Sequence, residues 1–137
     1  MCRSNAVGPC LGVGVEEALF DRSGCPVAYI ADDGEHSIYL WCGHAVAYLL
    51  GDCVFGWNGR HLGFFSYGVL CDIGGRRVGS TGASCQAATH AEPTKPAKHV
   101  KHVRYSRYEP SDHPDIRGIW STETLEDFLK QGSVVPI

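Results

Sequence analysis

The feature that most constrains this chain is an internal repeat built around four glycines. Gly24, Gly43, Gly59 and Gly75 follow one another at intervals of 19, 16 and 16 residues, and the residues around them agree in type. An aliphatic residue stands five positions before each glycine, and alanine or glycine stands four positions after it. Self-similarity at a short, regular period is the sequence signature of a repeat architecture.

Each glycine is expected to turn a β-hairpin. The pairs Asn58-Gly59 and Gly74-Gly75 are typical of a two-residue type I′ turn, which needs positive φ at both positions. This turn predicts that the residue five before the glycine pairs with the residue four after it, giving Leu19 with Ala28, Ile38 with Ala47, Val54 with Gly63 and Leu70 with Gly79. It also predicts an opposite face that carries Phe20, Val27, Tyr29, Tyr39, Val46, Tyr48, Phe55, Leu62 and Phe64.

Both faces of these hairpins are apolar, so both need a cover. A lone hairpin cannot provide one, whereas four hairpins closed around an axis bury their inner face together. The fold class we expect is therefore all-β: eight short antiparallel strands with pseudo-fourfold symmetry, in a small barrel-like or propeller-like body. The small residue four positions after each glycine indicates a close approach of backbones.

Four segments carry a resemblance to a known family: FDRSGCPVAYI (20–30), YLWCGHAVAYL (39–49), VFGWNGRHLGFF (54–65) and LCDIGGRRVGS (70–80). With these segments, over residues 19–81, the chain resembles the 4-fold β-flower proteins. Its tail is similar to that family's Pro/Lys-rich linker followed by a short segment with Trp-Ser, here Trp120-Ser121. The resemblance implies the flower-like fold and no catalytic residue, because the family has no established activity.

The chain divides into an N-terminal segment (1–18), the four-hairpin domain (19–85), an extended basic linker (86–117) and a short C-terminal helix with its tail (118–137). The first 15 residues faintly resemble a signal peptide but run into two glutamates. Residues 90–110 carry five basic and two acidic side chains, hence +3, between two segments of net −3 each.

A basic residue occupies every third position of the linker: Lys95, Lys98, Lys101, Arg104 and Arg107. Polyproline II has three residues per turn, so this spacing places all five cations on one ridge, and 15 such residues span about 45 Å. One interpretation is a site for nucleic acid or another polyanion over residues 93–107. The other is a solvated, semi-rigid spacer.

The C-terminal segment predicts a helix capped by Ser121 and ended by Gly132. Leu125, Phe128 and Leu129 form one apolar stripe, with Trp120 placed to staple it, and we expect these four residues to dock on something. The helix's own β domain is the default dock, and a neighbouring protomer or a partner protein is the alternative.

Residues after the turn glycines supply a candidate ligand site. His44, Arg60, His61, Arg76 and Arg77 occupy equivalent positions at the hairpin tips, and arginine forks suit phosphate or carboxylate. The simpler interpretation is that turn-flanking positions are exposed and therefore polar. Likewise, the carboxylates Asp32, Asp33, Glu35 and Asp52 fall in links between hairpins, where solvation explains them without acid–base chemistry.

Several classes of protein are not expected. The seven cysteines include no CxxC or CxxH pair, so no metal site is expected, and free thiols in a reducing cytoplasm are the simplest interpretation. No nucleotide-cradling glycine motif or catalytic motif occurs, so we expect neither a cofactor nor an enzyme. No stretch approaches the roughly 20 apolar residues of a membrane span.

The sequence therefore predicts a non-catalytic repeat β domain that binds a small ligand or a protein partner, with assembly mediated by its tail. The alternative is nucleic-acid or polyanion binding through the linker. The repeat region of about 63 residues is small for independent stability. Because the chain also has an extended tail and a helix that needs a dock, we expect a homo-oligomer.

Overall fold

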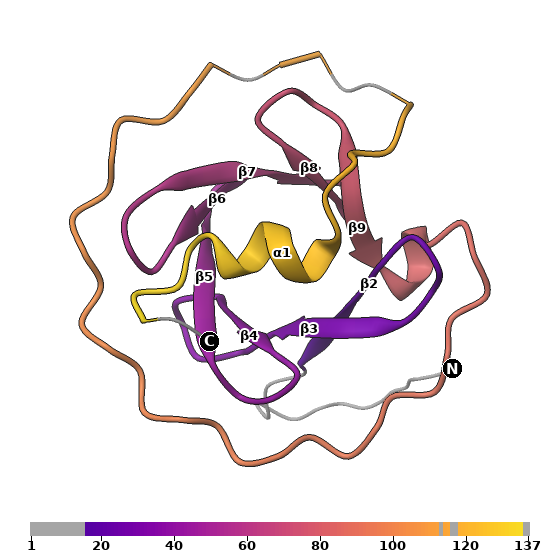
Figure 1. Ribbon diagram of the computed structural model, residues 1–137, viewed down its shortest axis with the longest axis horizontal. Coiled ribbons are helices and arrows are strands. Elements are labelled where there is room, and N and C mark those ends of the chain that lie inside the picture. The colour runs from indigo at the N-terminus through magenta and orange to yellow at the C-terminus, as the bar shows by residue number, and fades with distance from the viewer. Residues whose placement is uncertain (1–15, 113, 116–117, 136–137) are drawn as a thin grey trace.

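The computed structural model describes residues 16–112, 114–115 and 118–135. Eight antiparallel strands form a closed barrel in sequence order (Figure 1). They are β2 (Glu17–Phe20), β3 (Pro26–Ile30), β4 (Ser37–Leu40), β5 (Ala45–Leu50), β6 (Cys53–Gly56), β7 (His61–Ser66), β8 (Val69–Asp72) and β9 (Arg77–Thr81). The repeat thus predicted the fold class and the strands, although β2 begins at Glu17 rather than at residue 19.

The register of the four hairpins follows the repeat. Leu19 pairs with Ala28, Ile38 with Ala47, Val54 with Gly63 and Leu70 with Gly79, so all four predicted pairs are confirmed. The barrel closes where β2 pairs with β9, through Leu19 with Thr81 and Phe20 with Ser80. Closure removes the exposed strand edges that a four-hairpin sheet would otherwise present.

The predicted turn type at the hairpin tips is wrong. The amide of Gly59 donates to the carbonyl of Gly56, and the amide of Gly56 donates to the carbonyl of Arg60. Gly59 has φ of +91°, whereas Asn58 is not among the residues with positive φ. This is a three-residue loop, in which a type I turn is followed by a left-handed glycine and a bulge. The tips at Gly24, Gly43 and Gly75 have the same bonds.

The bulge changes the face on which one repeat column lies. The pairing slips by one residue, so Phe20 pairs with Pro26 and not with Val27. The extra residue turns inward, and the valine or leucine three positions after each glycine joins the inner core: Val27, Val46, Leu62 and Val78. These residues were expected on the opposite face. The aromatic residues stay outside, where Tyr29 and Tyr48 are nonetheless almost completely buried.

The inside of the barrel is filled by the chain's own last helix, α1 (Leu125–Lys130), as Figure 1 shows. Leu125, Phe128 and Leu129 are at most 1% exposed and pack with the inner residues of the strands. The helix therefore docks on its own domain, and the alternative dock on a partner is wrong for this stripe. Its N-cap is Thr124, which accepts a hydrogen bond from the Asp127 amide; the expected cap, Ser121, lies one turn earlier.

The chain enters and leaves the barrel beside defined strands. Before the helix, Trp120 forms an isolated parallel bridge with Arg77 at the start of β9. After the helix, Gly132 passes so close to Gly56 that a Cβ atom on Gly132 would lie 2.6 Å from the Gly56 Cα. There the side-chain amide of Asn58 donates to the Gln131 carbonyl at 2.8 Å, which fixes the end of α1.

Residues 86–112 and 114–115, which we call the belt, circle the outside of the barrel as an extended chain (Figure 1). The belt covers the outer face of the strands just as α1 covers the inner face. The expected cover for both apolar faces is thus supplied by the second half of the same chain. In the described ranges no helix has the length and apolar character needed to cross a membrane; the segment resembling a signal peptide lies outside them.

Candidate functional site

The belt touches the four hairpin tips at a constant interval. A Cβ atom built on each tip glycine would lie 2.1–2.6 Å from a belt carbonyl oxygen, pairing Gly24 with Ala88, Gly43 with Ala97, Gly59 with Ser106 and Gly75 with Asp115. Each of these four belt residues lies nine residues after the one before it. Nine residues are three turns of a three-residue repeat, about 28 Å of polyproline II. The period of the belt therefore matches the step from one hairpin to the next.

Backbone hydrogen bonds follow the same interval. The amides of His90, His99 and Tyr108 donate to the carbonyls of Gly24, Gly43 and Gly59 at 2.8, 2.9 and 2.8 Å. Two indole nitrogens add bonds from the barrel, since Trp41 donates to the Pro93 carbonyl and Trp57 to the His102 carbonyl. Pro93 and His102 are again nine residues apart. The barrel thus fixes the register of the belt through its backbone.

Two equivalent aromatic clusters line the outer face of the barrel. The first subsite consists of Tyr29, Tyr39 and Trp41, and the second of Tyr48, Phe55 and Trp57. In the first, the Tyr29 ring stacks with Tyr39 at 5.6 Å and meets Trp41 edge-on at 5.5 Å. In the second, the corresponding distances from Tyr48 are 6.0 Å to Phe55 and 5.6 Å to Trp57. The two subsites have the same geometry, one hairpin apart.

The belt cations lie over these rings. At the first subsite the Lys95 ammonium is 4.9 Å from the centre of the Tyr29 ring and 5.1 Å from that of Trp41. At the second, the Arg104 guanidinium is 4.3 Å from Tyr48 and 5.7 Å from Trp57. Cation–π contacts of this kind contribute roughly 0.5–2 kcal/mol each, depending on their exposure.

A second cation completes each subsite. Lys98 lies 5.6 Å from Tyr39, and Arg107 lies 5.7 Å from Phe55 at the equivalent place. Lys98 also lies 5.4 Å from the Tyr29 ring, while Arg107 donates a hydrogen bond to the Tyr48 hydroxyl at 3.3 Å. Each subsite therefore receives two cations three residues apart at equivalent places, and Lys101, which lies between the two pairs, is a further cation 5.6 Å from the Trp57 ring.

Carboxylates of the barrel pair with the belt cations. Glu16 lies 2.7 Å from Lys98 and 3.4 Å from Lys95, and Glu35 lies 2.7 Å from Lys101 and 3.4 Å from Arg104. Glu16 and Glu35 each stand eight residues before a tip glycine, so they are repeat equivalents. Because the pairs are partly exposed, each contributes little by itself, and the set acts mainly on register.

The ion pairs shift the titration of their members. Desolvation raises the pKa of Glu16, but the hydrogen bonds and charges of Lys98 and Lys95 outweigh it and hold that pKa below its usual value. Desolvation likewise raises the pKa of Asp33, but its hydrogen bonds with Lys101, Ser37 and the Glu35 amide together outweigh desolvation, and the pKa lies far below normal. The bond to Glu16 raises the pKa of Lys98. These groups are therefore charged near neutral pH.

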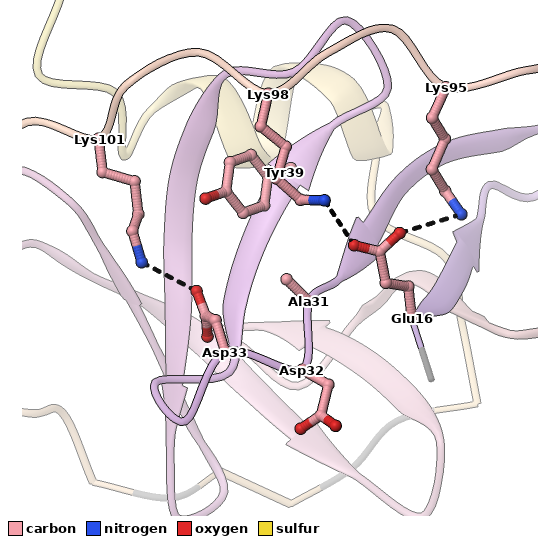
Figure 2. Close-up of a pocket in the computed structure, with 8 residues that line it drawn as sticks. All are labelled: Glu16, Ala31, Asp32, Asp33, Tyr39, Lys95, Lys98 and Lys101. Atoms are coloured by element: carbon pink, nitrogen blue, oxygen red, sulfur yellow. Dashed lines mark hydrogen bonds and ion pairs between the residues drawn. The ribbon is translucent and has the colours of Figure 1, made fainter. Parts of the chain in front are cut away.

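Figure 2 shows the pocket that these residues enclose between the belt and the barrel, with a volume of about 600 Å³. Lys95 and Lys98 reach down from the belt to Glu16, and Lys101 reaches Asp33. Tyr39 stands between Lys98 and Lys101, and Asp32 points away from the lysines. The lysines are thus directed at the barrel and not at solvent.

The predicted polyanion ridge therefore has a different orientation from the one expected. Its five cations do share one side of an extended chain, as their spacing predicted, but that side faces the barrel. An added polyanion would compete with Glu16, Asp33 and Glu35 for these groups.

The predicted ligand residues at the hairpin tips do not form one patch, because the tips point to different sides of the barrel (Figure 1). His44 stacks on His99 of the belt at 4.0 Å. Arg76 pairs with Asp72 at 3.3 Å. Arg60 is exposed, and Arg77 forms the bridge with Trp120.

His61 is buried against the belt. Its Nδ1 accepts a hydrogen bond from the Ser111 amide at 2.9 Å, so the neutral ring carries its proton on Nε2. Burial lowers the pKa of His61, although the Gly63 backbone and the charge of Asp52 oppose the shift. Desolvation, together with the charges of His99 and His102, likewise lowers the pKa of His44. Two of the five predicted ligand residues thus hold the belt instead.

No group of three or more His, Cys, Asp or Glu suited to a metal ion occurs within the described ranges. The cysteines described there, Cys25, Cys42, Cys53, Cys71 and Cys85, are free thiols.

Sequence reasoning missed the aromatic subsites, for which a signal was present. Trp41 and Trp57 occupy one repeat column, and Glu16 and Glu35 occupy another. Aromatic residues on an outer face, next to a tail with cations at every third position, are complementary in charge and period. That complementarity points to the docking of the tail on the barrel.

Comparisons with known proteins agree with the architecture. The family model described as 4-fold beta flower protein matches residues 17–129, which include the barrel, the belt and most of α1. None of the curated proteins and none of the solved structures that were compared gives a match. Four repeated hairpins closed around one axis, over a match that spans most of the chain, show that this protein belongs to the 4-fold beta flower family.

Proposed function

We propose that this protein is a non-catalytic binding module that holds an extended polypeptide segment on the outside of its barrel. The belt is the resident occupant, and a partner protein supplies a competing segment when the belt is displaced. The single observation that carries this proposal is the duplicated contact set, in which two subsites one hairpin apart hold the belt in the same way. Aromatic-lined surfaces are a common means of binding extended, proline-containing chains.

A small ligand on the barrel axis has less support, because the axis is occupied. Leu125, Phe128 and Leu129 of α1 fill the inner core. The remaining concave region is the pocket of Figure 2, and its three lysines are already paired with carboxylates. The outer surface is therefore the better candidate for exchange with a partner.

The belt has a large advantage over a free segment. A tethered segment acts at an effective concentration in the millimolar range when its length suits the site. A partner therefore gains access mainly when contacts of the belt are weakened. For this reason the test uses a chain in which the belt is loosened but still present.

The experiment measures binding of a dye-labelled peptide with the sequence of residues 91–110. It is titrated into the full chain with Lys95, Lys98, Lys101, Arg104 and Arg107 all changed to Gln, and anisotropy is followed. We expect saturable binding at least tenfold tighter than to the unchanged chain. Thermal unfolding and circular dichroism check that the variant is folded, and a folded variant that does not bind the peptide contradicts the proposal.

Two expectations from the sequence stay predictions. Homo-oligomerisation was partly argued from a helix that needed a dock, and α1 has its dock within its own chain; light scattering of the full chain tests it. Polyanion binding by the linker predicts a steep loss of affinity between about 50 and 200 mM salt.

A further inference from the structure

From the duplicated contacts we infer, on the basis of the proposed function, the chemistry of the partner segment. It is an extended chain with two pairs of basic residues and a further basic residue between them, at the place of Lys101, which pairs with Asp33 and Glu35. Within a pair the basic residues are three apart, and the two pairs begin nine residues apart. Either lysine or arginine is accepted, since the belt places lysines in the first subsite and arginines in the second.

The spacing within a pair follows from the geometry of the subsites. Lys95 and Lys98 lie over rings of the first subsite, as Arg104 and Arg107 do over the second. In an extended chain with three residues per turn, side chains three apart point the same way and lie about 9 Å apart along the axis. A spacing of two or four turns one of the pair away from the rings.

Backbone contacts fix the frame relative to each pair. Two residues before the first cation of each pair, the carbonyls of Pro93 and His102 accept hydrogen bonds from Trp41 and Trp57. Four residues after the first cation of each pair, the amides of His99 and Tyr108 donate to the carbonyls of the tip glycines Gly43 and Gly59. Proline is therefore allowed at the first of these positions and excluded at the second, which must donate its amide hydrogen.

Two of the side chains between the pairs are free of the barrel. Val100 is 93% exposed and Val103 is 87% exposed, although both lie inside the segment that bridges the subsites. The surface therefore selects the spacing of cations and the backbone frame but leaves these side chains unspecified.

The neighbouring quadrant of the barrel supplies an internal comparison. At the first hairpin, Arg22 replaces the repeated tryptophan and stacks on Trp120 instead. The belt residues nine before Lys95 and Lys98 are Gln86 and Thr89, which are uncharged. Cations are thus absent from these belt positions where Ser80 and Arg22 stand in place of the tyrosine and tryptophan, although Phe20 remains. This is the expected pattern if the tyrosine and tryptophan rings and the cations recognise one another.

The test is a competition series on the full chain that carries the five Gln substitutions described above, with the labelled peptide of residues 91–110 as probe. Unlabelled peptides of one composition keep the lysine of position 101 and carry the four paired cations at native spacing, with spacing of four within each pair, or with seven residues between the starts of the pairs. We expect each altered spacing to weaken competition at least tenfold. Equal competition by all peptides would overturn the inference and leave only general charge attraction, whereas failure of the probe to bind would count against the proposed function.

A second measurement uses the chain with its own cations in place. The exchange of Val103 and Arg104 (V103R/R104V) keeps the composition but moves one cation off its rings, and the exchange of His102 and Val103 (H102V/V103H) is the matched control. We expect faster hydrogen exchange at the Tyr105 and Tyr108 amides in the first variant only. Equal exchange in both would overturn the inference even if the peptide series were limited by folding of the Gln variant.

Discussion

The carbonyl oxygen of Ser106 lies 2.1 Å from the point where a Cβ atom on Gly59 would stand. The glycine is therefore required twice, once for its φ of +91° and once for the approach of the belt. Four such contacts, one at each hairpin tip, fasten the belt to the barrel.

Alanine at Gly59 separates these two requirements when it is compared with alanine at Gly51. Gly51 also has positive φ, of 62°, but nothing lies within 4 Å of its Cβ position. We expect Gly51→Ala to lower the free energy of unfolding by about 1 kcal/mol through strain alone. Gly59→Ala should lower it further and speed hydrogen exchange of the Tyr108 amide. Equal losses in urea unfolding, with Tyr108 still protected, would show that the belt contact is unimportant.

Truncation of Phe128 should destabilise the whole barrel. Its ring is 1% exposed, and its tip lies 3.0 Å from the Cβ position of Gly63. Removal of a buried phenylalanine costs about 3–5 kcal/mol, because transfer free energy is lost and a cavity remains. Urea unfolding followed by tryptophan fluorescence measures the change, and Ile73→Ala, at a 41% exposed position, should stay within about 0.5 kcal/mol. A small effect of Phe128→Ala would mean that α1 is not part of the core.

Neutralisation of Glu35 should weaken the belt in a salt-dependent way. Glu35 pairs with Lys101 at 2.7 Å and with Arg104 at 3.4 Å, and these groups are partly exposed. We expect Glu35→Gln to cost roughly 0.2–1 kcal/mol at low salt and almost nothing near 1 M salt. Asp32→Asn, which removes a nearby carboxylate directed away from the lysines, is the control. A salt-independent loss would indicate packing and not charge.

Acidification should loosen the belt at His61. The pKa of His61 is lowered from an ordinary 6.5, so the unfolded chain takes up this proton at a higher pH than the folded chain. The contribution of His61 to the free energy of unfolding is therefore complete above pH 6.5, and it is lost as the pH falls towards the pKa of His61 in the folded chain. We expect a fall in melting temperature between pH 7.5 and 5.5, and a shallower fall in His61→Asn, which retains an acceptor for the Ser111 amide.

An identical pH profile in His61→Asn would show that another group is responsible. His44 is the nearest alternative, since its pKa is lowered as well. His44→Gln, measured alongside, distinguishes the two histidines.

The repeat was sufficient to predict the hairpins, their register at Leu19–Ala28 and its equivalents, and closure around one axis. The turn type predicted for the hairpin tips was wrong because Asn-Gly and Gly-Gly favour type I′ turns only when two residues form the loop. Here the loop has three, and a left-handed pair of residues occurs instead at Tyr67-Gly68, between hairpins. The bulge that follows each tip then reversed the expected face of Val27 and its equivalents.

The candidate site was predictable only in part. The spacing of the linker cations predicted an extended chain with one charged side, which the structure has. The direction of that side depends on contacts between residues far apart in sequence, such as Lys95 with Tyr29. Local period alone does not distinguish a chain that faces solvent from one that faces its own barrel.

The position of α1 has a consequence for biosynthesis. Residues 125–130 are translated after all eight strands and the belt, yet they fill the centre of a body formed by residues 17–81. Until α1 has been synthesised, the nascent sheet lacks the apolar side chains that fill its inner face. Stable closure must therefore wait for α1, and a nonsense codon between the belt and α1 would yield an open, aggregation-prone product, however intact its hairpins.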